Sequence, residues 1–71
     1  MSKTELNLKI QTRADKDGLA ANHELRLLGE ALDTATVGFY SEPQTVSVKK
    51  FMGCWARARK AWSDYSGEPL V

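Results

Sequence analysis

Apolar and polar residues alternate strictly near the start of the chain. Over residues 5–11, Leu6, Leu8 and Ile10 are separated by single polar residues. A period of two places every apolar side chain on one face of an extended strand, so the pattern predicts a strand over 4–12. A single strand leaves its backbone groups unpaired, and it needs a second strand from this chain or from another subunit.

The apolar spacing changes to three or four residues further along the chain. At 100° per residue, most apolar side chains of segment 15–36 fall within an arc of roughly 160°. Asp15 and Asp17 suit the positive N-terminal end of a helix dipole, whereas Gly18 and Gly29 weaken a helix. The spacing predicts a first amphipathic helix over 15–36.

A second amphipathic helix is predicted over 46–65. Its apolar positions cluster within roughly 100° at helical spacing. They are Val48, Phe51, Trp55, Ala58, Trp62 and Tyr65. Gly67 and Pro69 are typical of a helix end, and residues 66–71 are expected to form a tail.

The connection between the two predicted helices has more than one interpretation. Ser41 with Gln44, or alternatively Ser47, would cap the second helix. The segments 36–40 and 45–50 are also rich in Val, Thr and aromatic residues, which suits a β-hairpin. The first interpretation gives a mainly helical α+β fold of one strand and two helices, with the strand paired in a dimer. The hairpin gives a βαββα fold with a three-stranded sheet.

The length of 71 residues predicts a single small domain over 1–71. Natural proteins of this size are often stabilised by disulfides, a metal or a partner subunit. Cys54 is the only cysteine and His23 the only histidine, too few for an internal disulfide or for the usual four ligands of zinc. We therefore expect no cofactor and no metal, and we expect a homodimer.

The sequence lacks the features typical of membrane, secreted and catalytic proteins. No apolar run reaches membrane-spanning length and the first residues do not resemble a signal sequence, so we expect a cytoplasmic protein that does not contact a membrane. Catalytic motifs, Gly-rich phosphate loops and Cys/His pairs at useful spacing are missing. His23 is expected at the surface and Cys54 as a small buried hydrophobe. The protein is not expected to be an enzyme.

Charge is unevenly distributed along the chain, although the net charge is only +1. Residues 14–42 carry six acids and two bases, whereas residues 43–62 carry five bases and no acid. Either the two predicted helices complement each other, or the second offers a basic face to an anionic partner. The aromatic residues of the second helix belong either to the core or to an interface, where tryptophan is enriched.

The order of strand, helix, connection and helix resembles the ribbon-helix-helix (Arc-type) repressors. In that family, strands from two subunits pair as a ribbon whose polar side enters the major groove of DNA. Segment 6–10 (Leu-Asn-Leu-Lys-Ile) resembles the ribbon, and segment 38–41 (Gly-Phe-Tyr-Ser) resembles the turn before the helix that holds a phosphate. The resemblance implies that Asn7 and Lys9 read base edges.

The resemblance and the basic second helix together predict a small dimeric DNA-binding regulator, of a phage or plasmid. The expected DNA contacts are Asn7, Lys9, Gln11, Ser47, Lys49, Lys50, Arg57 and Lys60. The expected interface residues are Leu6, Leu8, Ile10, Phe51, Trp55 and Trp62. The alternative is a protein-interaction module, an accessory subunit or inhibitor of a larger protein, that uses the aromatic face of the second helix or the acidic first helix.

Overall fold

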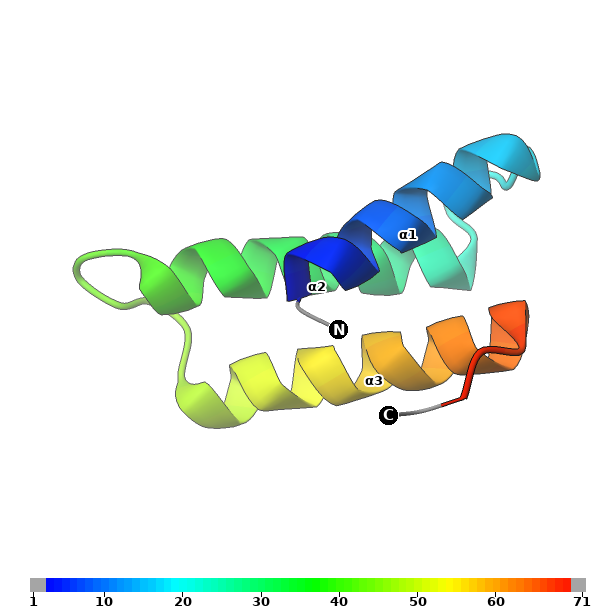
Figure 1. Cartoon of the computed structure of the whole chain (residues 1–71). Helices are drawn as coiled ribbons and strands as arrows, with labels where there is room; N and C mark the ends of the chain where they lie inside the picture. Colours follow the sequence, from blue (N-terminus) through cyan, green and yellow to red (C-terminus); the bar gives the residue numbers. More distant parts are fainter. Residues whose placement is uncertain (1–2, 70–71) are drawn as a thin grey trace.

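The computed structural model describes residues 3–69, and these residues form three helices. The helices are α1 (Lys3–Lys16), α2 (Glu24–Tyr40) and α3 (Val48–Ser66). α2 and α3 run antiparallel as a helical hairpin, and α1 lies obliquely against it, mainly on α2 (Figure 1). The described residues contain no strand. The predicted α+β fold and the βαββα alternative are therefore both wrong.

The strand predicted over 4–12 lies within α1. Leu6, Ile10 and Ala14 are buried and recur every four residues, which places them on one stripe of a helix. Leu8 lies on the other side of α1 and is 65% exposed. The alternation was misleading because two of its three apolar residues, Leu6 and Ile10, also satisfy helical spacing. Because Lys3–Lys16 form a helix, this segment does not supply a ribbon strand to a dimer.

The helix predicted over 15–36 begins later than expected. α1 ends at Lys16, and residues 17–23 connect it to α2. Gly18 has a φ of 64°, a left-handed conformation that glycine adopts without steric strain and that ends the first helix. His23 caps α2, because its Nδ1 accepts a hydrogen bond from the Leu25 N–H at 3.1 Å. Asp15, Asp17 and Gly18 therefore lie at the end of α1 and not at the start of the next helix.

The helix predicted over 46–65 is confirmed as α3. Of the alternative caps, Ser47 is the one used, and its hydroxyl accepts from the Lys50 N–H at 3.2 Å. At the other end Gly67 has a φ of 82°, and its N–H donates to the Ser63 carbonyl. α2 continues through Tyr40, so the hairpin over 36–40 and 45–50 is not formed.

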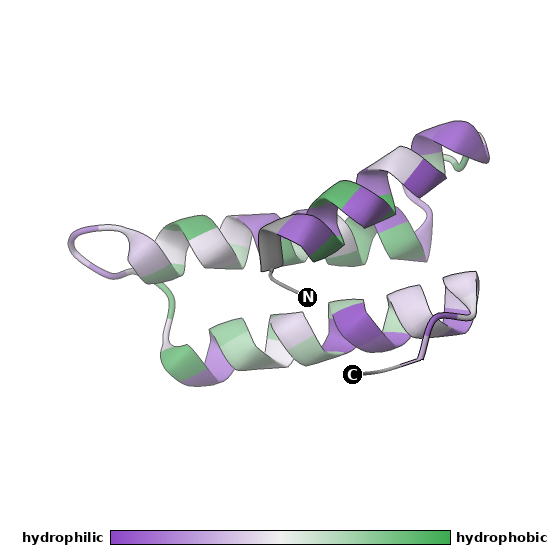
Figure 2. Cartoon of the chain, viewed as in Figure 1, coloured by the Kyte–Doolittle hydropathy of each residue, from purple (hydrophilic) through white to green (hydrophobic). Residues whose placement is uncertain are grey.

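The core lies where the three helices meet. Each helix alternates apolar with polar bands along its ribbon (Figure 2). α2 packs against both α1 and α3, and all three helices contribute buried residues to one core. α1 and α2 approach each other closely at Gly29, since a Cβ there would lie 3.0 Å from Cγ2 of Ile10. Among the described residues, no helix has the length and apolar character needed to cross a membrane.

Candidate functional site: the basic face of α3

The solvent side of α3 is basic. Lys49, Lys50, Arg57 and Lys60 are all exposed and fall within an arc of about 100°, roughly opposite the buried side of the helix. We call these four residues the basic face. The first acidic residue of α3 is Asp64, one turn beyond Lys60.

The charges of the basic face are only slightly compensated. Lys60 lies 3.3 Å from Asp64, but both side chains are highly exposed, so water and salt screen this pair. The Arg57 guanidinium folds back along α3 and donates to Cys54 Sγ at 3.6 Å. Within residues 3–69, Lys49 and Lys50 form no ion pair. Arg59 lies apart from this face, with its guanidinium 5.5 Å from the centre of the Trp55 ring.

The residues expected to read DNA bases do not join the basic face. Asn7 and Gln11 lie on one side of α1, and helical spacing places Lys9 on the opposite side. Gln11 donates to the Asn7 side chain at 3.5 Å, and Lys9 pairs with Glu68 at 3.3 Å. The structure therefore does not bring the base-reading residues together with Lys49 and Lys50.

Most of the expected interface residues lie in the core of the single chain. Phe51 and Trp62 are buried within the three-helix core, and Trp55 is half-buried against it. Phe51 stacks on Phe39, with ring centres 4.5 Å apart. Leu8 is the exception, because it is exposed on α1.

A cluster that sequence reasoning missed joins α1 to the end of α3. Tyr65 donates a hydrogen bond to the Asp17 carboxylate, which also accepts from Arg13 Nε at 2.8 Å. These two hydrogen bonds, that of Tyr65 first, lower the pKa of Asp17, and the same contact raises the pKa of Tyr65. Tyr65 and Asp17 are 48 residues apart in the sequence, so no local pattern predicts their contact.

The last described residues also bind to the helices. The Trp62 indole donates to Glu68 at 2.8 Å, and Lys9 approaches the same carboxylate. The indole hydrogen bond and then Lys9 hold the pKa of Glu68 below its ordinary value. The tail predicted over 66–71 therefore begins later, since Ser66 is helical and Glu68 is held in place; residues 70–71 lie outside the described part.

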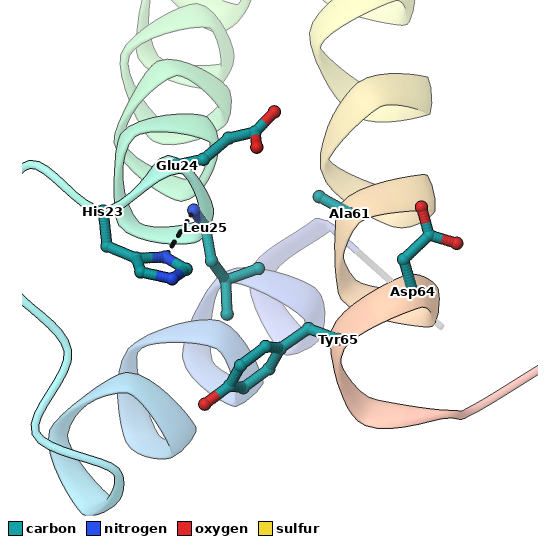
Figure 3. A pocket seen from close by; sticks show the side chains of 6 residues that line it. All are labelled: His23, Glu24, Leu25, Ala61, Asp64 and Tyr65. Carbon is teal, nitrogen blue, oxygen red and sulfur yellow. Dashed lines mark hydrogen bonds between the residues drawn. The ribbon is translucent and has the colours of Figure 1, made fainter.

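A hollow of about 260 Å³ beside this cluster contains no arrangement typical of catalysis. It is lined by His23, Glu24, Leu25, Ala61, Asp64 and Tyr65 (Figure 3). His23 uses Nδ1 as the cap of α2, and the carboxylates of Glu24 and Asp64 point away from its ring (Figure 3). In the part of the chain that the structure describes, no group of three His, Cys, Asp or Glu side chains could hold a metal ion.

Comparisons of the chain with protein-family models, with curated proteins and with solved structures give no match. The fold and the surface define a small three-helix domain with a basic outer face on its last helix. That face is the candidate functional site.

Proposed function

We propose that this chain binds the phosphate backbone of nucleic acid through the basic face of α3. The supporting observation is the grouping of four exposed bases on one side of a single helix, with no acid between Lys49 and Lys60. At 1.5 Å per residue these two lysines lie about 16 Å apart along the helix axis. One strand of DNA carries several phosphates over that length.

The binding we propose is largely independent of sequence. Lys and Arg side chains that contact phosphates supply affinity and orient the protein, but they do not distinguish one base sequence from another. A ribbon that reads the major groove is not part of this proposal, because residues 4–12 are helical. A net charge of only +1 gives little overall attraction, so the proposal rests on the local grouping of bases on α3.

The test compares two lysine variants in an anisotropy titration with labelled DNA between about 50 and 200 mM salt. Lys49→Gln should weaken binding to all sequences alike and lower the salt slope by about one unit, because one phosphate contact is lost. Lys16→Gln, which makes the same charge change on α1, is the matched control and should leave the slope unchanged.

Two results would contradict the proposal. One is no binding by the folded wild-type protein at low salt, which would favour a protein partner for the basic face. The other is an equal loss of affinity in Lys16→Gln and Lys49→Gln, which would mean that overall charge and not this face controls binding.

A further inference from the structure

A second surface feature is a groove between α2 and α3. It has a volume of about 330 Å³, and no residue of α1 lines it. Its apolar lining includes Leu27 and Ala31 from α2 with Val46 and Cys54 from the other side. Leu27 is 49% exposed, so the groove leaves apolar surface in water.

The two edges of the groove carry opposite charges. Glu30 lines it from α2 and Lys50 from α3, and both residues are exposed. Within residues 3–69 neither of them forms an ion pair. An apolar floor between an acidic edge and a basic edge is complementary to a copy of itself.

The complementarity follows from symmetry. Consider a two-fold axis that is parallel to α2 and α3 and lies in the plane of the groove mouth. Rotation about this axis places α2 of each copy over α3 of the other. Because Glu30 and Lys50 line the same groove they lie at similar levels along the axis, and the rotation does not change that level. Each Glu30 therefore faces Lys50 of the second copy, and the same contact occurs twice, as in any isologous interface.

We infer that two copies of this chain associate through this groove as an antiparallel helical bundle. Leu27 and Ala31 of each copy cover the apolar floor of the other, and the two Glu30–Lys50 pairs fix the register. Lys50 is the one residue that the groove shares with the basic face, and the other three basic-face residues do not line the groove, so the association can be measured without nucleic acid.

The experiment measures mass in solution by sedimentation, without nucleic acid and with a reductant that keeps Cys54 as a thiol. The wild-type protein should reach twice the chain mass as its concentration rises. Glu30→Lys leaves two basic edges and Lys50→Glu leaves two acidic edges, so each variant alone should remain at the mass of one chain. An equal mixture of the two variants should recover the doubled mass, because their edges are again opposite.

The controls are Asp33→Lys and Lys49→Glu, which make the same charge changes on the same helices outside the groove. Both should dimerise as the wild type does. A wild type that stays at the mass of one chain at all concentrations overturns the inference. It is also overturned if the mixture of groove variants does not associate, or if the controls lose association to the same extent. Circular dichroism of each variant shows whether the helices are intact.

Discussion

The phenol of Tyr65 donates a hydrogen bond to the carboxylate of Asp17, 48 residues earlier in the chain. Arg13 donates to the same carboxylate at 2.8 Å, and its guanidinium lies 5.3 Å from the centre of the Tyr65 ring. This contact holds the end of α1 against the last turns of α3. The cluster therefore closes the domain at the end where residues 17–23 connect α1 to α2.

Replacing Tyr65 by Phe should separate the hydrogen bond from the packing of the ring. We expect the pKa of Asp17 to rise towards its ordinary value of 3.8, because its strongest hydrogen bond is lost while Arg13 remains. The melting temperature should fall by a few degrees. A carboxyl-detected NMR titration measures the pKa, and the Glu68 signal in the same spectra is the internal control. An unchanged Asp17 pKa would contradict the contact.

Acid should destabilise the domain through Asp17 and Glu68. Both pKa values are lowered in the folded chain from ordinary values of 3.8 and 4.5. A lowered carboxyl pKa stabilises the fold above the unfolded value, and this contribution is lost as the pH falls through the folded pKa. Melting temperatures should therefore be level above about pH 5 and fall below about pH 4.5. The double variant Asp17→Asn with Glu68→Gln should melt lower at neutral pH and show a shallower fall in acid.

Leu6 and Leu8 distinguish the helix from the strand that the alternation predicted. Leu6 is fully buried, so Leu6→Ala should cost about 2–5 kcal/mol, most of the stability of a marginal domain. Leu8→Ala should change stability by no more than about 0.5 kcal/mol, because this side chain is exposed. Leu8→Asp should also fold. Denaturant unfolding measures all three variants, and a Leu8→Asp protein that does not fold would restore the strand interpretation.

Gly38 and Gly53 should respond in opposite ways to alanine. A Cβ at Gly38 would clash with the Val46 side chain and lie 2.8 Å from Thr45 Oγ1, so the connection over 41–47 must shift. A Cβ at Gly53 would meet only the flexible end of Arg57, at 3.4 Å. We expect Gly53→Ala to raise stability by about 0.5–1 kcal/mol through helix propensity. Gly38→Ala should lower it, and an equal gain in the two variants would show that Val46 does not pack on Gly38.

α3 could be predicted because its pattern is long and has several local signals that agree. Phe51, Ala58 and Trp62 repeat at helical spacing over three turns, and they are buried. Ser47 is the N-cap of α3, and Gly67 ends the helix in a left-handed conformation, as is typical of these residue types. The basic face followed from the same pattern, since a helix with a buried stripe must expose the opposite side.

α1 could not be predicted because a five-residue alternation fits two periods. Leu6 and Ile10 suit either a strand or a helix, and the decision depends on whether Leu8 is covered. In this fold α2 offers Gly29 opposite Ile10, and nothing equivalent covers Leu8. The cluster of Tyr65 with Asp17 was also beyond sequence patterns, since it depends on how three helices close in space.

The contact between the two ends of the chain affects when folding can finish during synthesis. α1 is made first, but Asp17 and Lys9 reach Tyr65 and Glu68 only when the end of α3 is present. We expect α1 to reach its final position only after the end of α3 emerges. A released chain that ends before residue 65 should therefore be helical but incompletely closed.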